Sequence, residues 1–596
     1  MNPSVKNFIV NAFGSFFGSF FGTLFAVFIS FILLPVIIIG FIAGQRHAVI
    51  EPIKDKSILH LDIRGTIKEK RRPIGFDLFG GDWGLQDPPI GLFELNRAID
   101  LAKKDSRIHG IYMTIRQFDA GWAAVSSLRR KLVEFAETGK WIYVYADRLN
   151  EMGYYLATAG TQIFLQPHGE IEFNGLAAHE TFLKGLADKL EVEPIIFRVG
   201  KFKSAVEPFV QEKMSEENRE QLSALIGDIW KEVLTAAAEV AKKDQSQIDE
   251  LATSLQIVSA QSAKDAGFVH ETAFADVVED RMRAFTVGRG EELEFVNPGR
   301  LLRESASLKK RRAKKKIAVI FAEGEIHSGK GGTDTIGSED LREEVKNARQ
   351  DEDIVAIVLR VNSPGGDALA SDVIWRELRL SDEEIPIIAS MGDVAASGGY
   401  YIASAARYIF AEPTTITGSI GVFGFMFNTE KFFKNKVGIS FDRAVTNPHA
   451  DMGSFTRPIT PTETKVIQSE VERIYKRFLD VIQESRGYEE RKDLEEIAEG
   501  RVWSGIRARE LGLVDELGGL DQAIAKAAEY ANVKDYTIEV FPSDVETLRM
   551  IFERFAEDVT IRVFGERVKE VKAISRILDE RKPVIRARLP FDLTIK

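Results

Sequence analysis

Cysteine is absent from the 596-residue sequence, which excludes disulfide frameworks, thiol nucleophiles, iron–sulfur clusters and cysteine-based zinc sites. Basic residues are too few for a chain that coats nucleic acid: 79 lysines and arginines stand against 90 aspartates and glutamates, so the net charge is −11. No nucleic-acid partner is therefore expected. The remaining composition, 44% hydrophobic and 28% charged residues, is typical of a globular protein with more than one domain.

Charged side chains are missing from residues 7–44, a run of 38 residues rich in Phe, Ile, Val and Leu. About 20 apolar residues cross a bilayer as a helix, whereas a cleaved signal peptide has a shorter apolar stretch. The run predicts an uncleaved membrane anchor over residues 1–45, with a single transmembrane helix near residues 20–43. The charges on its two sides do not decide its orientation.

The sequence after this run contains an internal repeat. Its two copies match at an offset of 246 in three pairs of segments: 110–116 with 356–362, 154–157 with 400–403, and 163–164 with 409–410. The alignment predicts a first repeat at 46–300, a basic linker at 301–316, a second repeat at 317–543 and a charged tail at 544–596. Short β-branched runs alternate with helical segments in each copy, which predicts an α/β fold with largely parallel strands.

A serine follows a predicted strand at one turn of the second copy. Ser397 stands between two alanines and two glycines where a strand turns into a helix, and the N–H of Gly398 points to where an oxyanion would develop. The first copy has Glu151 at this position. A Pro-Gly-Gly turn that ends at Gly366 is also present in the second copy alone, and its glycines leave backbone amides open to an anion.

A serine nucleophile needs a base. None of the eight histidines has an aspartate partner in a triad-like setting, although distance along the sequence does not exclude one. Lysine serves when burial lowers its pKa, and Lys203 lies among apolar and small residues. Its counterpart in the second copy is His449, so one copy would supply the nucleophile and the other the base. The alternative is an ordinary turn and a solvated lysine.

Four motifs occur in a fixed order on the duplicated chain: Lys-Ser-Ala-Val-Glu-Pro-Phe at 203–209, Asn-Ser-Pro-Gly-Gly at 362–366, Ala-Ser-Gly-Gly-Tyr-Tyr at 396–401 and Thr-Gly-Ser-Ile-Gly at 417–421. Together they resemble the signal peptide peptidase A (protease IV) family in its long, duplicated form. The resemblance implies two tandem repeats with the fold of the Clp protease and crotonase families, behind the transmembrane helix.

The same resemblance implies a serine endopeptidase with a Ser–Lys dyad and without cofactor or metal ion. Ser397 would be the nucleophile and Lys203 the general base. The backbone amides of Gly366 and Gly398 would form the oxyanion hole, and Ser419 would orient the lysine.

The family also implies partners and a location. We expect a homotetramer on the bacterial inner (cytoplasmic) membrane, with the catalytic domain on the periplasmic side, that degrades cleaved signal peptides and other apolar peptides. An apolar groove would suit such substrates, and four residues after the 417–421 motif are candidates to line it or to pack in the core: Phe423, Phe425, Met426 and Phe427. Neither the 73–89 loop nor the tail has a chemical signature.

Two other functions fit part of these features. A crotonase-like acyl-CoA enzyme also holds an oxyanion with two backbone amides, but it does not explain the anchor, Ser397 or Lys203. A non-catalytic membrane scaffold would keep these residues as remnants. The linker, with seven basic residues in the eight at 309–316, is either solvated or in contact with anionic lipid.

Overall fold

The computed structural model describes residues 22, 52–70, 91–288, 290–308, 313–332, 334–542, 584–588 and 594–595. Contacts divide the chain into two units, Met1–Ile53 with Ile74–Gln86, and Lys54–Pro73 with Asp87–Lys596. Apart from residue 22, the predicted anchor lies outside the described residues, as does the 73–89 loop, and the fold below is that of the second unit. Within the described part of the chain, no helix is both long and apolar enough to cross a membrane.

The first repeat is built on a six-stranded sheet of order β7-β4-β3-β2-β1-β8, in which all pairs are parallel. Helices connect successive strands, as parallel pairing requires. The strands are β1 (Ser57–Thr66), β2 (Ile108–Asp119), β3 (Trp141–Leu149), β4 (Gln162–Ile171), β7 (Glu271–Thr272) and β8 (Phe295–Val296), and the connecting helices are α3 (Leu92–Lys104), α4 (Trp122–Ala136) and α5 (Glu151–Ala157).

The second repeat has a sheet of order β18-β16-β14-β12-β9-β20, with β15 (Tyr408–Ala411) beside β14 and β19 (Glu516–Leu517) beside β15. Strand β12 is buried along almost its whole length, as expected for a strand covered by helices on both faces. The path contains β9 (Lys316–Glu323), β12 (Ile354–Ser363), β14 (Ile387–Ala396), β16 (Ile416–Gly418), β18 (Val502–Ser504) and β20 (Thr537–Phe541), and the helices between its strands include α13 (Ser338–Gln350), α14 (Ala368–Glu384) and α15 (Gly398–Ala403).

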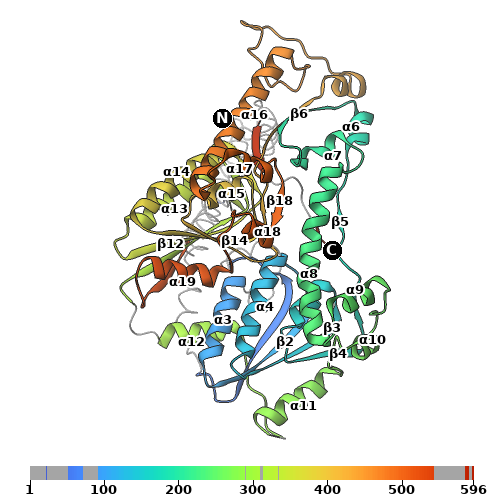
Figure 1. Ribbon diagram of the computed structural model, residues 1–596, viewed down its shortest axis with the longest axis vertical. Coiled ribbons are helices and arrows are strands. Elements are labelled where there is room, and N and C mark those ends of the chain that lie inside the picture. Colours follow the sequence, from blue (N-terminus) through green and yellow to red (C-terminus); the bar gives the residue numbers. More distant parts are fainter. Residues whose placement is uncertain are drawn as a thin grey trace, which may run out of the picture. The chain divides into compact units, whose positions relative to one another are not determined.

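Equivalent helices recur at a constant spacing. The long helices α8 (Glu216–Ala241) and α16 (Pro461–Arg486) each have 26 residues and begin 245 residues apart. The same spacing separates the starts of α10 (Ala260–Ala266) and α18 (Gly505–Glu510), and of α11 (Ala275–Thr286) and α19 (Leu520–Tyr530). The duplication predicted from the sequence is thus confirmed, and in Figure 1 its copies run from blue to green and from yellow to red.

A third sheet, of order β11-β10-β13-β21-β17-β6, joins distant parts of the chain. Strand β6 (Glu193–Val199), from the first repeat, pairs antiparallel with β17 (Val422–Asn428) of the second over seven residues. Phe197 of β6 belongs to the core of the second repeat. The other strands are β10 (Glu325–His327), β11 (Thr335–Gly337), β13 (Gly365–Asp367) and β21 (Val584–Arg588). This pairing carries the segment after β6, which contains Lys203, into the second repeat.

Three regions add to the sequence-based expectation. Strand β14 runs to Ala396 and α15 spans Gly398–Ala403, so Ser397 alone separates the strand from the helix. Helix α12 (Pro298–Leu308) covers the first half of the predicted basic linker. The tail, which has no signature in the sequence, contributes β21 and also β22 (Thr594–Ile595), which pairs with β5 (Ala178–His179).

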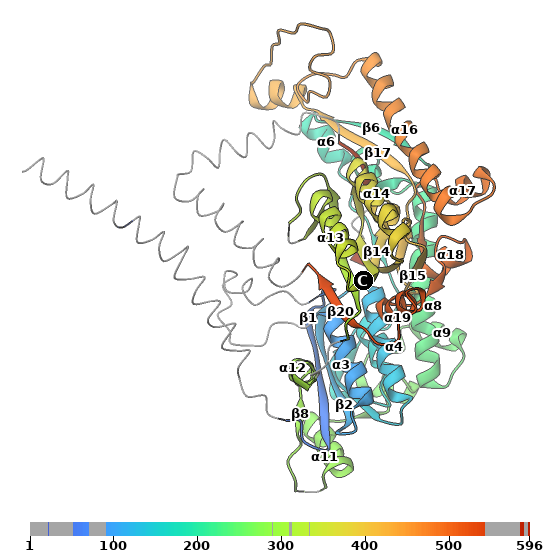
Figure 2. The ribbon, with the colours of Figure 1, turned by 90° about the vertical axis from the view of Figure 1, so that its left-hand side faces the viewer.

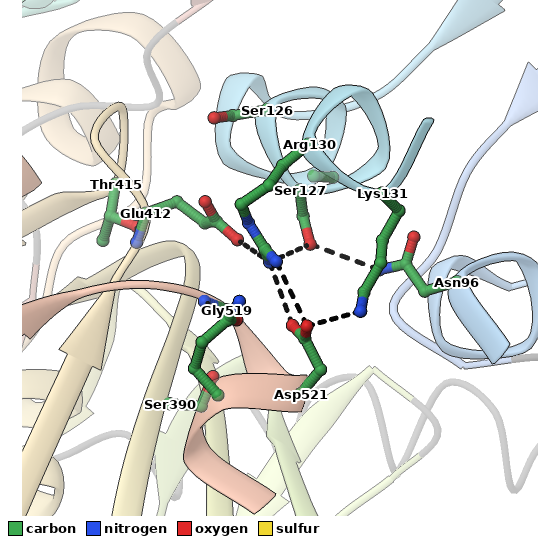
Figure 3. A network of polar contacts seen from close by, with 12 residues as sticks. Asn96, Ser126, Ser127, Arg130, Lys131, Ser390, Glu412, Thr415, Gly519 and Asp521 are labelled. Carbon is green, nitrogen blue, oxygen red and sulfur yellow. Dashed lines mark hydrogen bonds and ion pairs between the residues drawn. The ribbon is translucent and has the colours of Figure 1, made fainter. Parts of the chain in front are cut away.

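Charged residues join the two repeats (Figure 3). Arg130 of α4 donates to Asp521 at 3.0 and 3.1 Å and to Glu412 at 3.1 Å, and Lys131 pairs with Asp521 at 2.5 Å. The side chain of Glu412 is only 1% exposed, so its charge depends on Arg130 for compensation. Figure 2 shows α4 beside α19, the helix that carries Asp521.

A second contact between the repeats is made by the strand that leads to Ser397. Asp393 of β14 accepts a hydrogen bond at 2.8 Å from the N–H of Ala124, at the start of α4. A Cβ on Gly121 would lie 1.9 Å from Cγ of Asp393, so the carboxyl group packs directly on the glycine that precedes the helix. On the neighbouring strand, Arg360 holds Glu69 of the first repeat by two bonds of 3.0 Å. Both charges of this pair are buried.

Candidate active site

Lys203 and Ser397 meet in a buried cluster. Nζ of Lys203 lies 2.9 Å from Oγ of Ser397, 2.9 Å from Oγ of Ser419 and 3.1 Å from the carbonyl oxygen of Ser419. All three residues are fully buried. The lysine comes from the first repeat and both serines come from the second, so neither repeat contains the cluster alone.

Ser397 is held in a strained backbone conformation. Its φ of 55° and ψ of −116° lie outside the ordinary regions for a non-glycine residue, at a cost of about 1–3 kcal/mol. The strain is maintained by a 2.8 Å bond from its N–H to the carbonyl of Gly418 and by tight packing at Gly399, where a Cβ would lie 2.5 Å from the carbonyl oxygen of Ser363. The serine therefore sits on a sharp turn between β14 and α15.

The stem of Lys203 is packed against glycines of the second repeat. A Cβ on Gly500 would lie 2.7 Å from Cβ of Lys203, and one on Gly421 would lie 3.3 Å from its Cδ. The N–H of Phe202 also donates to the carbonyl of Glu499 at 3.0 Å. These contacts leave no room for side chains at the two glycine positions and fix where the amine points.

Gln221 of α8 links the lysine loop to strand β18, and the sequence analysis missed it. Its Nε2 donates to the carbonyl of Phe202 and to Oγ of Ser204, both at 3.1 Å, and its Oε1 accepts from the N–H of Val502 at 3.2 Å. The side chain is buried. The only signal in the sequence is a polar residue beside the apolar stripe of an amphipathic helix, which by itself does not indicate a functional position.

Burial lowers the pKa of Lys203 well below its ordinary value, because an ammonium group removed from solvent is strongly disfavoured. The surroundings are mainly hydroxyls, carbonyls and glycines. Ser419 is itself in a left-handed conformation, with a φ of 51°, and its N–H donates to the carbonyl of Arg501 at 2.6 Å. Its position beside Nζ is thus fixed by the backbone.

The two glycines predicted to form an oxyanion hole lie on turns that follow adjacent strands. Ser363, at the end of β12, pairs with Ala395 of β14, so the turn to Gly366 and the turn to Gly398 leave the sheet at the same edge. Gly366 has a φ of 158°, and a Cβ there would lie 1.9 Å from the carbonyl oxygen of Ile326. Gly398 is the first residue of α15, where backbone N–H groups lack partners inside the helix.

The first repeat lacks this chemistry at the equivalent turn. Asn150 caps α5 by accepting from the N–H of Gly153 at 2.8 Å, and the adjacent Glu151 is buried and accepts from the N–H of Asn174 at 3.1 Å. Burial raises the pKa of Glu151. His449, the counterpart of Lys203, is instead exposed and bonded to Glu463 at 3.1 Å. These residues complete local structure and form no second dyad.

The three phenylalanines of β17 lie on one face of the strand, but they are not equally buried. Phe423 and Met426 are buried, and Met426 belongs to the core of the second repeat. Phe425 and Phe427 are half-buried and contact Phe209, with ring centroids 4.7 and 5.9 Å apart. Of the four candidate groove residues, Phe425 and Phe427 are therefore partly accessible, whereas Phe423 and Met426 serve as packing.

The fold and the cluster define a duplicated α/β protein with a serine and a lysine in contact at a strand-to-helix turn. The family model Peptidase family S49 matches residues 134–287 and again 379–534. The chain belongs to this family and contains two copies of its domain. Among the described residues, no group of histidine and acidic side chains is placed to hold a metal ion.

Related proteins match over most of the chain. A protein named Protease 4 from Salmonella typhi is 35% identical over 85% of this chain and 83% of its own. Protease 4 from Haemophilus influenzae is 31% identical over 90% and 91%, and the chloroplastic serine protease SPPA of Arabidopsis thaliana is 33% identical over 81% and 70%. The solved structure of a ClpP1 mutant from Listeria monocytogenes covers 35% of this chain and 94% of its own, with 16% identity and a TM-score of 0.24, too low to support an argument.

Proposed function

We propose that this serine peptidase of the protease IV type hydrolyses peptide bonds with Ser397 as nucleophile and Lys203 as general base. One observation carries the proposal: the 2.9 Å contact between a fully buried lysine amine and a serine hydroxyl on a strained turn. Burial lowers the pKa of this amine well below the ordinary lysine value, which favours the neutral form that is able to accept a proton.

The hydrogen bonds around Nζ of Lys203 indicate where the two N–H groups and the lone pair of a neutral amine would point. A neutral amine has two N–H donors and one lone pair, and Ser419 offers two acceptors, its carbonyl oxygen at 3.1 Å and its Oγ at 2.9 Å. With both donors used there, the lone pair faces Oγ of Ser397. Lys203 takes the hydroxyl proton as Oγ bonds to the scissile carbonyl carbon, and it returns that proton to the leaving amine. Water then repeats the cycle on the acyl-enzyme.

The oxyanion of each tetrahedral intermediate would be stabilised by the backbone N–H groups of Gly366 and Gly398. Such donors contribute most when they are fixed before the reaction: Gly366 lies on a turn determined by close backbone packing, and Gly398 is the first residue of helix α15. A crotonase-like acyl-CoA enzyme would share these donors but has no need of the Lys203–Ser397 contact.

The substrates we propose are cleaved signal peptides and other apolar peptides. The half-buried rings of Phe209, Phe425 and Phe427 support an apolar preference. We further propose a homotetramer on the bacterial inner membrane, with the active site on the periplasmic side. A long uncharged segment at residues 7–44 would hold such an enzyme where released signal peptides reside.

The test is hydrolysis of an apolar, signal-peptide-like substrate by detergent-solubilised protein. Ser397→Ala and Lys203→Ala should each lower kcat by about a thousandfold or more. Lys201→Ala is the matched control, because Lys201 is 60% exposed and pairs with Glu499 at 3.2 Å; its activity should stay within about twofold of wild type. Turnover retained by folded Ser397→Ala or Lys203→Ala protein would remove that residue from the mechanism.

A further inference from the structure

A strand from the C-terminal tail lies between two strands of the active site. β21 pairs antiparallel with β13 on one side and with β17 on the other. β13 contains Gly366, and β17 begins three residues after Ser419. Between the end of β17 and the start of β21 stand 155 residues of sequence, so this is a long-range arrangement.

The register places the tail strand across the candidate oxyanion site. Ala587 is opposite Gly366, and Arg588 is opposite Gly365. Arg586 pairs on both sides, with Asp367 of β13 and with Phe423 of β17. β21 also contacts α15, the helix that begins immediately after Ser397. The backbone of residues 584–588 therefore runs past the nucleophile's turn.

An extended peptide binds to a sheet by adding a strand to an open edge, with main-chain hydrogen bonds supplying affinity. β13 and β17 offer two such edges facing one gap, and the gap has the width of one strand because β21 fills it. Since Gly366 is at this gap, a peptide substrate would need the same place. The tail and a substrate cannot occupy it together.

We propose that residues 584–588 act as an intramolecular, substrate-like strand that closes the peptide-binding cleft, so that the chain's own tail restrains its peptidase activity. The proposal rests on the proposed function of the Ser397 site. Since the strand is part of the same chain, it competes as an intramolecular ligand at an effective concentration that a free peptide must overcome. Displacement of the tail is then a step that precedes substrate binding.

The test compares two chains that differ in β21 alone. One ends at Pro590 and keeps β21, and the other ends at Pro583 and lacks it; both lack β22. A third variant, Ala587→Pro in the full-length chain, removes one N–H from the strand. If the cleft is closed nine-tenths of the time, the chain ending at Pro583 should show kcat/KM about tenfold above that of the chain ending at Pro590. Ala587→Pro should rise above wild type in the same direction.

A synthetic peptide with the sequence of residues 581–590 should inhibit the chain ending at Pro583 competitively, raising KM and leaving kcat unchanged. The same peptide with proline in place of Ala587 is the control and should inhibit at least about tenfold more weakly, because proline removes a ladder hydrogen bond. This arm remains informative even if the Ala587→Pro chain folds poorly.

Equal kcat/KM for the two truncated chains and for Ala587→Pro, with no inhibition by the peptide, would overturn the inference while leaving the peptidase proposal intact. Absence of hydrolysis in every chain, including the wild type, would overturn the peptidase proposal and the inference with it. Peptide release from the tail of wild type but not of Ser397→Ala would support the inference, since it requires the strand in the active site.

Discussion

At the scale of single residues, the site combines a buried amine with backbone strain. Lys203 is fully buried, and both Ser397 and Ser419 have positive φ values of 55° and 51°. Strain of this kind persists only where surrounding contacts determine it, and here the contacts are the glycines at 399, 421 and 500. The positions of Lys203 and Ser397 therefore depend on close packing that a methyl group at any of these glycines would disturb.

The lowered pKa of Lys203 makes a prediction about stability. Between the folded pKa and the ordinary value of 10.5, the unfolded chain binds a proton that the folded chain does not. The free energy of unfolding of wild type should therefore rise with pH in this window, relative to Lys203→Met, by up to about 1.4 kcal/mol per pH unit. Urea unfolding at several pH values measures the difference. Parallel pH dependences of the two proteins would show that Lys203 is not neutral when folded.

Two glycines allow the effect of backbone strain to be distinguished from the effect of contact with Lys203. Gly500 and Gly438 have φ values of 77° and 80°, but a Cβ would lie 2.7 Å from Lys203 Cβ at Gly500 and would meet nothing within 4 Å at Gly438. Both Gly→Ala variants should lose about 1 kcal/mol from the backbone. Gly500→Ala should also lose about tenfold or more in kcat, whereas Gly438→Ala keeps it. Equal kcat values in a peptide assay would show that this packing does not position the amine.

At the scale of elements, helix α8 connects the loop that contains Lys203 to the second repeat. Gln221 on this helix bonds Phe202 and Ser204 on either side of Lys203, and also Val502 of β18. The helix thus holds the lysine loop against the strand that follows Arg501, whose carbonyl fixes Ser419.

Replacing Gln221 should misplace the amine without removing it. We expect Gln221→Leu to lower kcat by about tenfold and to shift the pH dependence of kcat, with a smaller effect on KM. Gln468→Leu on the equivalent helix α16 is the control, since Gln468 contacts only Glu472 on the surface among the bonds that the structure describes for its side chain. An unshifted pH profile in Gln221→Leu would assign this glutamine to folding alone.

The sequence predicted the elements that are duplicated and the motifs that carry chemistry, and little else. The constant offset revealed the two copies, and the unusual Ser-Gly-Gly and Pro-Gly-Gly turns located Ser397 and Gly366. The third sheet could not be found this way, because its strands pair across long stretches of sequence, β6 with β17 and β17 with β21. Gln221 could not be predicted because its role depends on its contacts with Phe202, Ser204 and Val502, which are distant in sequence and leave no local pattern.

At the scale of the whole described unit, the dyad depends on how the repeats are joined. Lys203 reaches Ser397 only because β6 pairs with β17 and because charged and capping contacts hold α4 to the second repeat. Two similar copies that did not contact each other would not bring Lys203 and Ser397 together. On the proposed mechanism, the contacts between the copies should therefore matter for activity as well as for stability.

The network in Figure 3 gives a measure of this coupling. Arg130→Ala leaves Glu412, 1% exposed, without its guanidinium partner and should cost about 3 kcal/mol of unfolding free energy. Arg148→Ala breaks a pair whose side chains are 71% and 61% exposed and should cost less than about 1 kcal/mol. Chemical denaturation compares the two, and a loss in Arg130→Ala no larger than in Arg148→Ala would mean that the network contributes little.

The central claim, that a neutral lysine of one repeat activates a serine of the other, is tested most directly by the pH dependence of kcat/KM for an apolar peptide. As Lys203 loses its proton, activity should rise with pH along a single limb whose midpoint lies well below 10.5. A flat profile between about pH 6 and 10, or a limb centred at the ordinary lysine value, would contradict the account.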